Sequence, residues 1–345
     1  MAVSFRWRSL ARFAITALLV GAALELGARA ILGLRGAHVA QLRAAYWNPR
    51  RAENLYEPHP YLPYVLRPDL DRPGVRTNSL GRRGHEPRPG SFRILCLGAS
   101  ATFGLSGAEN AWPSALERAL ERRYRGRVFD VQNAGVPGYT SADNLVDFAL
   151  RGIDLAPQVV VAEPGATDVL LSPSPDFRSD HSHARRSLAS EPNLFDFAPG
   201  WFEGSAFFLL VRHALYGRAR AGKAGLVTVT TRPFRTDGIY RGLPALRRNL
   251  RTLVVLARSA GAGAVFVTHP FLPTEPGWDR AMEDTAKAIR EVASEEGVPV
   301  ADALEEIRDP ALFRPLDPLH LLPQGEHRIA ELVLRAIEAT GRLGP

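Results

Sequence analysis

The sequence contains one cysteine and two lysines, and each scarcity excludes a class of protein. Cys96 alone cannot form an intrachain disulfide, so the chain is not a disulfide-stapled domain. A single cysteine does not indicate whether the protein works in a reducing or an oxidising compartment. Because lysine occurs only at Lys223 and Lys287, arginine supplies nearly all of the positive charge, and it is interspersed with acidic residues. A basic stripe with interleaved aromatic residues is missing, so the formal net charge of +7 does not predict a nucleic-acid partner.

Three motifs that mark common active or ligand sites are also missing. No serine stands in a Gly-x-Ser-x-Gly pentapeptide, which excludes the nucleophile turn of the α/β-hydrolase fold. No glycine-rich loop carries the lysine of a Walker motif, and no Gly-x-Gly-x-x-Gly follows an expected strand. We therefore do not expect nucleotide binding, and we expect no cofactor and no metal.

An apolar run near the N-terminus is long enough to form a membrane-spanning helix. It covers residues 13–34 and follows a basic tail at residues 1–12. Such a helix crosses about 30 Å of hydrocarbon, with the basic tail on the cytoplasmic side. Glu25 and Arg29 stand four residues apart, so they can pair on one helical face. We expect an uncleaved anchor with the remainder on the periplasmic side of the inner membrane. A signal peptide cleaved at Ala28-Arg29-Ala30 and a buried soluble helix are the alternatives.

The rest of the chain, 46% hydrophobic overall, changes pattern once. Residues 35–90 are rich in proline and arginine and predict an irregular lead-in outside the cytoplasm. From residue 91 to 342, short apolar runs alternate with helical stretches, which predicts a parallel sheet with helices on both faces. The expected strands are 92–97, 128–132, 158–162, 264–268 and 298–301. The expected helices are 112–123, 141–151, 243–259, 279–295 and 325–338.

Residues 171–236 interrupt this alternation and predict an insertion over the sheet edge. A polar loop comes first, followed by an expected helix at 201–216 and a possible strand or hairpin at 227–231. The aromatic residues of the helix predict a small core of the insertion, and a lid that faces acyl chains or the membrane is the alternative.

Ligands of an open parallel sheet bind beyond the carboxyl ends of its strands, so the residues there are the candidates for chemistry. Ser100 follows the first expected strand and should begin a helix or turn, where its amide and the helix dipole favour an anion. A serine hydroxyl needs a base to become a nucleophile, and His320 is the best candidate. Asp317, three residues earlier, can hold its imidazole in the required tautomer. His269 ends the fourth strand, where we expect it to pack, and a place among the residues that line the same rim is the alternative.

Four segments at this rim resemble, in order and spacing, the blocks of the SGNH (GDSL) hydrolases. The first three are Gly98-Ala-Ser-Ala-Thr-Phe-Gly104, Asn133-Ala-Gly-Val-Pro-Gly138 and Glu163-Pro-Gly-Ala-Thr-Asp168, and the fourth is Asp317-Pro-Leu-His320. Upstream, Asn78-Ser-Leu-Gly-Arg-Arg-Gly84 is similar to the lead-in of bacterial members with a membrane anchor. The resemblance implies a flavodoxin-like three-layer sandwich around a central parallel sheet.

The resemblance also implies roles for individual residues. Ser100 matches the nucleophile, Asp317 and His320 match the last block, and the amides of Ser100 and Gly135 match the oxyanion donors. Thr167 stands where the family has an asparagine whose amide also donates to the oxyanion. Losing such a donor costs about 10²- to 10³-fold in kcat. Ala99 replaces the aspartate of Gly-Asp-Ser, as in small-residue variants among anchored relatives.

The resemblance implies a serine esterase that acts on acyl esters, acetyl above all, of cell-envelope glycans or lipids. Two alternatives stay open on the same residues. An O-acyltransferase would pass the acyl group to a polysaccharide hydroxyl instead of water. A catalytically degenerate protein, suggested by Thr167 and Ala99, would bind glycans or assist their assembly. The oligomeric state is not predicted.

Overall fold

The structure, a computed structural model, describes residues 7–34, 55–57, 59–172, 177–181, 204–211 and 241–344. The chain divides into two compact units, which we describe separately. The first comprises Met1–Asn54 and Ser190–Thr228, and the second comprises Leu55–Ala189 and Val229–Pro345. Most of the expected insertion, including the possible strand at 227–231, lies outside the described residues.

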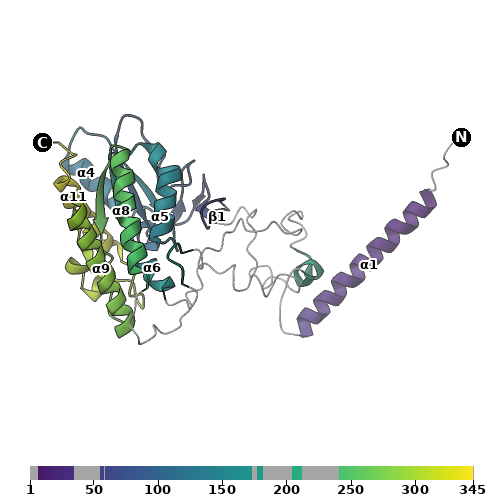
Figure 1. Cartoon of the computed structure of the whole chain (residues 1–345). Coiled ribbons are helices and arrows are strands. Elements are labelled where there is room, and N and C mark those ends of the chain that lie inside the picture. The colour runs from purple at the N-terminus through teal and green to yellow at the C-terminus, as the bar shows by residue number, and fades with distance from the viewer. Residues whose placement is uncertain are drawn as a thin grey trace. The chain divides into compact units, whose positions relative to one another are not determined.

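The second unit is built on a five-stranded parallel sheet with the order β6-β5-β7-β8-β9 (Figure 1). Its strands are β5 (Phe92–Gly98), β6 (Phe129–Gly135), β7 (Val159–Glu163), β8 (Gly263–Val267) and β9 (Val300–Ala301). Almost every residue of β5 to β8 is buried, as in parallel sheets covered on both faces. The predicted parallel sheet is confirmed, and its order is that of flavodoxin-like folds.

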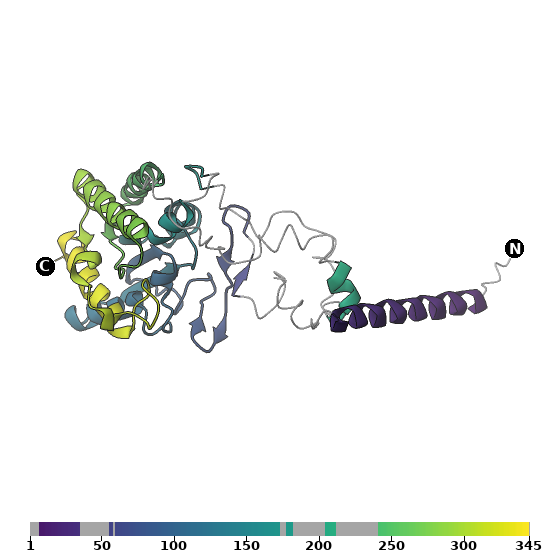
Figure 2. The same ribbon diagram turned by 90° about the horizontal axis from the view of Figure 1, so that it is seen from below.

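Helices cover both faces of this sheet (Figures 1 and 2). One face packs against α4 (Trp112–Arg123) and α11 (Pro323–Ala339), and the other packs against α8 (Leu243–Ser259) and α9 (Pro276–Glu296). The second face also carries α5 (Ser141–Asp147), which continues into a π-helical turn, Phe148–Gly152, and a 3₁₀ turn, Ile153–Leu155. The remaining short helices are α3 (Ser100–Phe103), α6 (Ala166–Leu171), α10 (Ala303–Glu306) and a 3₁₀ turn at Pro310–Leu312.

Helix α4 shows how apolar spacing sets the packing. Pro113 stands in its first turn, where its missing N–H is not needed. Trp112, Leu116 and Leu120 recur every four residues and are fully buried against the sheet. Burying each leucine contributes about 1.5–3 kcal/mol relative to leaving it exposed. The expected bounds of α4 and α8 are confirmed, and those of α9 and α11 extend by one to three residues at each end.

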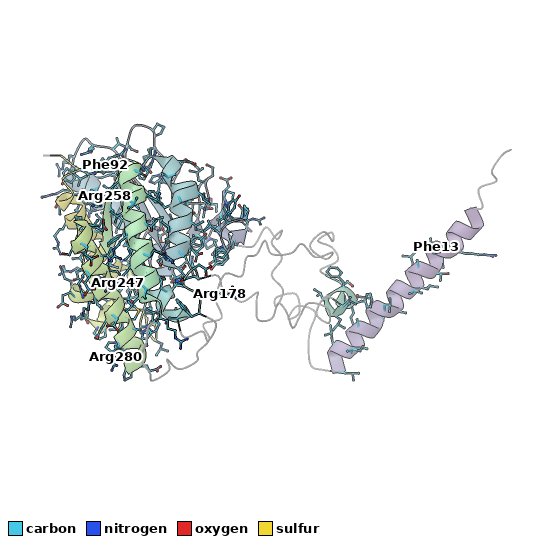
Figure 3. All side chains as sticks on the ribbon, in the orientation of Figure 1. Phe13, Phe92, Arg178, Arg247, Arg258 and Arg280 are labelled. Carbon is cyan, nitrogen blue, oxygen red and sulfur yellow. The ribbon has the colours of Figure 1, made fainter. Side chains whose placement is uncertain are left out.

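Arginines on α8 pair with glutamates on α9. Arg247 and Arg258 lie along α8 (Figure 3), where Arg247 pairs with Glu291 and Arg258 lies 3.1 Å from Glu296. Arg251 lies 2.6 Å from Glu295. These cations therefore face carboxylates, which agrees with the interspersed charges of the sequence.

Much of the lead-in belongs to the second unit. Its described part forms two short antiparallel hairpins, β1 (Tyr56–Glu57) with β2 (Val65–Leu66) and β3 (Asp71–Arg72) with β4 (Val75–Arg76). The side chain of Asn78 donates to Gln132 Oε1 on β6, at 3.0 Å. Arg82 and Asp147 on α5 form an ion pair in which both side chains are buried. These contacts fix the segment to the sheet and to α5.

In the first unit, α1 (Trp7–Leu34) contains an apolar stretch at Ala11–Leu34 that is long enough to cross a membrane. Large apolar side chains such as Phe13 project from this helix and are exposed (Figure 3). Glu25 and Arg29 form the expected i,i+4 pair at 2.7 Å. Residues 206–211, within the helix expected at 201–216, are helical. Ala206 packs against Ala28 and Leu32 of α1.

Candidate active site

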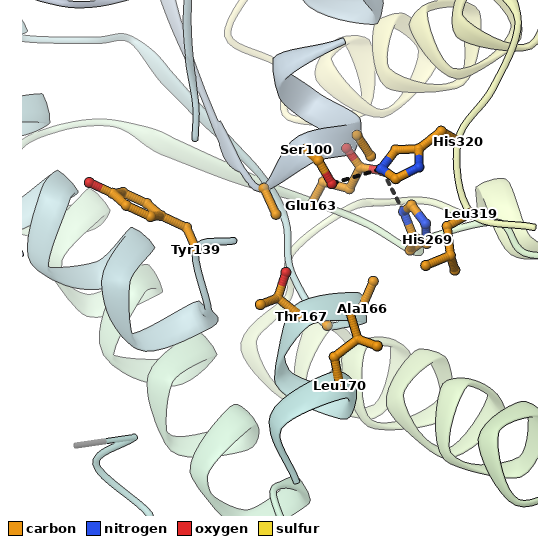
Figure 4. Close-up of a pocket in the computed structure, with 12 residues that line it drawn as sticks. Ser100, Tyr139, Glu163, Ala166, Thr167, Leu170, His269, Leu319 and His320 are labelled. Carbon is orange, nitrogen blue, oxygen red and sulfur yellow. Dashed lines mark hydrogen bonds and ion pairs between the residues drawn. The ribbon is translucent and has the colours of Figure 1, made fainter. Parts of the chain in front are cut away.

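The sheet register sets the ends of three strands level with one another. Gly98 at the end of β5 is paired with Gly135 of β6 and with Glu163 of β7. The strand order changes direction between β5 and β7, which is where ligands of such sheets bind. A pocket of about 70 Å³ lies at this edge (Figure 4). It is lined by Ala99, Ser100, Ala101, Tyr139, Glu163, Gly165, Ala166, Thr167, Leu170, His269, Leu319 and His320.

Three side chains predicted to act together are linked by contacts of hydrogen-bond length, and two of them, Ser100 and His320, line the pocket (Figure 4). Ser100 is the first residue of α3, directly after β5, as expected. The Nε2 atom of His320 lies 2.8 Å from Ser100 Oγ. Its Nδ1 atom lies 2.8 Å from Asp317 Oδ2. The arrangement is that of a nucleophile, a base and the carboxylate that orients the base.

The turn that carries His320 orients its own ring. Asp317 Oδ1 accepts hydrogen bonds from the amides of Leu319 and His320, each at 3.1 Å, so the carboxylate is fixed beside the imidazole. Burial tends to raise the pKa of Asp317, but the charge of His320 and these hydrogen bonds outweigh it and lower that pKa. Burial lowers the pKa of His320 and outweighs the opposing effect of Asp317. The ring is therefore neutral at pH 7 and can accept a proton.

Thr167 lines the same pocket from the first turn of α6. Its side chain is buried, and its hydroxyl makes no hydrogen bond to any of the residues that the structure describes. The next residue, Asp168, accepts hydrogen bonds from Ser141 N at 3.0 Å and Ser141 Oγ at 2.5 Å. This contact fixes the start of α6, and with it Thr167, to the start of α5.

Gly135 does not take the position expected of an oxyanion donor. Its amide donates to Asn133 Oδ1 at 2.9 Å, and it is not among the residues that line the pocket. A Cβ atom built on Gly135 would lie 2.3 Å from the backbone nitrogen of Phe103. The glycine thus allows α3 to pack closely on β6, and its amide is already paired.

The turn after β6 offers another amide. Tyr139 N donates to Val136 O at 3.1 Å across Pro137 and Gly138, and Gly138 has a φ of +85°. Proline followed by a glycine of positive φ is the pattern of a type II turn, whose central amide takes no part in the turn hydrogen bond. Within the described part of the chain, the Gly138 amide has no partner, and Tyr139 beside it lines the pocket.

A buried carboxylate that sequence reasoning did not single out lies behind the nucleophile. Glu163 Oε2 accepts hydrogen bonds from Thr102 Oγ1 on α3 at 2.7 Å and from Trp112 Nε1 at 2.9 Å. Glu326 on α11 is also buried and accepts from the Trp112 amide at 3.0 Å. Burial and the charge of Glu163 raise the pKa of Glu326 well above its usual value. The one sequence signal was a glutamate at the end of an otherwise apolar strand.

The lead-in also contacts the nucleophile helix. The guanidinium of Arg83 donates to the carbonyl oxygens of Phe103 at 2.7 Å and Gly104 at 2.8 Å, where α3 ends. It also donates to Gly74 O at 2.6 Å and lies 3.8 Å from the centroid of the Phe103 ring. A cation at the C-terminal end of a helix meets its unpaired carbonyls and the negative end of its dipole. Burial lowers the pKa of Arg83 to about 10, so it remains charged at pH 7.

The comparison with known families agrees with this geometry. Residues 96–328 match the model of the GDSL-like lipase/acylhydrolase family. The chain belongs to this family. It is thus an enzyme of the esterase type, and its predicted GDSL/SGNH fold is confirmed. No curated protein sequence matches the chain significantly.

The chain also matches several solved structures at low sequence identity. LAE5, an alpha/beta hydrolase from the metagenome of Lake Arreo, is 19% identical, with a TM-score of 0.46 over 74% of this chain and 97% of its own. Axe2, an acetylxylan esterase from Geobacillus stearothermophilus, is 18% identical, with a TM-score of 0.46 over 72% and 95%. A putative lipolytic protein of the G-D-S-L family from Desulfitobacterium hafniense is 13% identical, with a TM-score of 0.43 over 71% and 99%.

Proposed function

We propose that this family member is a membrane-anchored serine esterase that works outside the cytoplasm and forms an acyl-enzyme on Ser100. The hydrogen-bonded arrangement of Ser100, His320 and Asp317, of which Ser100 and His320 line the pocket, carries the proposal. The substrates are acyl esters, acetyl esters above all, of cell-envelope glycans or lipids.

In the proposed reaction, His320 takes the proton of Ser100 as its Oγ attacks the ester carbonyl. Asp317 holds the imidazole and stabilises the imidazolium that forms. His320 then gives its proton to the oxygen of the departing alcohol, which leaves the acyl group on Ser100. Water attacks this ester with His320 again as the base, and the acid and free Ser100 result. A sugar hydroxyl in place of water would give acyl transfer, and product analysis with glycan acceptors separates the two reactions.

The oxyanion of each tetrahedral intermediate requires donors that are not already paired. The Ser100 amide qualifies because the first amides of a helix have no partner within that helix. The Thr167 hydroxyl qualifies because it lines the pocket without a partner among the described residues. We assign the third position to the Gly138 amide instead of the paired amide of Gly135.

The pocket favours a short acyl group. Its volume is about 70 Å³, and Ala166 and Leu170 of α6 form part of its wall. An apolar wall in the pocket that also holds Ser100 suits the methyl of an acetyl group, whereas a long acyl chain would have to extend beyond the pocket. Acetyl esters are therefore the first substrates to examine.

The contacts within the first unit support a retained anchor over a cleaved signal peptide. Glu25 Oε1 accepts from the Ala206 amide at 3.0 Å, and Glu25 Oε2 accepts from Ser205 Oγ at 2.7 Å and the Phe207 amide at 3.1 Å. Ala28, within the possible cleavage site, is buried against Ala206. Cleavage there would remove Glu25 from the segment that it binds. The intact mass of the protein extracted from membranes tests this, because cleavage removes about 30 residues.

Labelling with a fluorophosphonate tests the catalytic proposal. The full chain in detergent, incubated with the reagent, should gain one adduct on Ser100 and hydrolyse acetylated glycans or lipids. Ser100→Ala should lose both the adduct and the hydrolysis, while its melting temperature stays close to that of the unsubstituted protein. A folded protein that gains no adduct would refute the activated serine and favour a glycan-binding role.

A further inference from the structure

His269 lines the pocket but has no place in the proposed triad. It follows β8 and is 7% exposed. Its Nδ1 atom lies 3.0 Å from Glu163 Oε1. Its Nε2 atom is buried and has no hydrogen-bond partner among the residues that the structure describes. This differs from the packing role that its sequence position suggested.

The surroundings of Glu163 fix which nitrogen of His269 carries the proton. Glu163 Oε2 accepts from the Trp112 indole, which can only donate, and from the Thr102 hydroxyl. Both of these contacts use Oε2, so Oε1 is the oxygen that accepts from Nδ1 of His269. In the tautomer that this contact selects, Nδ1 of His269 donates to Glu163 and Nε2 carries the lone pair, so Nε2 is an acceptor.

An acceptor of this kind in a substrate pocket indicates a missing donor. A buried polar atom without a partner is unfavourable, and such atoms in native proteins usually meet a ligand or water. Figure 4 shows the His269 ring close to His320 and Leu319, with Thr167 on the other side of Ala166. His320 protonates the departing alcohol, so His269 borders the alcohol side of the substrate and not the oxyanion side.

We propose that His269 selects the alcohol portion of the substrate, its Nε2 accepting a hydrogen bond from a hydroxyl group next to the ester oxygen. The inference rests on the proposed esterase function and narrows its substrate to esters of polyols, in which a free hydroxyl neighbours the acylated one. Esters of simple alkyl alcohols leave Nε2 without its partner. Glycans and glycerolipids share the required hydroxyl.

The test compares two acetates that differ in one group. 2-Hydroxyethyl acetate carries the neighbouring hydroxyl, and propyl acetate has a methyl group in its place. The full chain should hydrolyse the first with a kcat/KM about tenfold higher, which corresponds to one hydrogen bond. His269→Phe should reduce this ratio to about one, mainly by lowering kcat/KM for the hydroxyl substrate.

Two controls separate recognition from a structural role. His269→Gln places an amide oxygen close to the position of Nε2, so it should restore much of the ratio. The rate of fluorophosphonate labelling of Ser100 should stay within about twofold in both variants, because the reagent offers no hydroxyl for His269. Equal losses for both acetates in His269→Phe, or an unchanged ratio, would overturn the inference.

The outcomes also distinguish this inference from the proposed function. If Ser100 is labelled and the ratio of kcat/KM for the two acetates does not depend on His269, the proposed function stands and the role of His269 is refuted. A chain that is not labelled refutes the function itself. Acetylated methyl xyloside represents the glycan, and monoacetylglycerol represents the glycerolipid. The compound whose kcat/KM falls more in His269→Phe identifies which of the two supplies the hydroxyl.

Discussion

Replacing Arg83 should lower the stability of the fold and the reactivity of Ser100 together. Arg83→Met removes the donors to Phe103 O and Gly104 O, both in buried residues, and the donor to Gly74 O, in an exposed residue where water can substitute. A buried carbonyl left without a partner costs about 1–3 kcal/mol, so the two together predict a loss of about 2–6 kcal/mol in the free energy of unfolding. Most domains have about 5–15 kcal/mol, so the variant should remain folded.

Urea unfolding and fluorophosphonate labelling measure the two effects on the full chain in detergent. We expect a lower urea midpoint, and labelling of Ser100 at least about tenfold slower in the absence of urea, because α3 loses the cation that fixes its C-terminal end. Arg76→Met is the matched control, since Arg76 belongs to the same lead-in and pairs with Asp71 in an exposed salt bridge. Unchanged stability and unchanged labelling in Arg83→Met would refute the reasoning.

Three further predictions concern the pocket and the carboxyl groups behind it. Since the pKa of His320 is lowered and the neutral ring is the base, the acid limb of the kcat/KM profile should lie below pH 6.5. Asp317→Asn should move this limb to a lower pH still and reduce kcat by about 10⁴-fold. An acid limb above pH 7 would contradict the assignment of His320 as the base. Thr167→Val should reduce kcat by about 10²-fold with little effect on the melting temperature, and an unchanged kcat would show that its hydroxyl is not an oxyanion donor. Glu326 has a raised pKa in the folded protein, so the folded state keeps a proton that the unfolded chain releases above pH 4.5, and stability falls as the pH rises toward the folded-state pKa. Glu326→Gln should therefore raise the melting temperature by a few degrees at pH 7–8 and not at pH 4. Calorimetry at both pH values checks this.

Local patterns predicted the sheet and its helices because burial on both faces leaves a clear mark on a sequence. The continuous apolar runs at β5 and β7 and the four-residue spacing in α4 follow directly from which side chains are buried. The proximity of Ser100, Asp317 and His320 could be predicted because each follows a strand or precedes a helix at the same edge of a parallel sheet.

Other features depend on contacts between residues far apart in the chain. The pairing of the Gly135 amide with Asn133, and its close approach to Phe103, follow from how α3 packs on β6. Glu163 comes directly after the strand expected at 158–162, and only the positions of Thr102, Trp112 and His269 around it show a buried carboxylate with three partners.

The sequence by itself determined the fold class, the membrane-length helix and the identity of the three candidate catalytic residues, because these depend on local periodicity and on side-chain chemistry. The tertiary structure alone decided which amides and which nitrogen of His269 have no partner among the described residues, and how Arg83 holds the nucleophile helix. Hydrogen-bond partners depend on distances of a few tenths of an ångström between distant segments, and no local pattern encodes those distances.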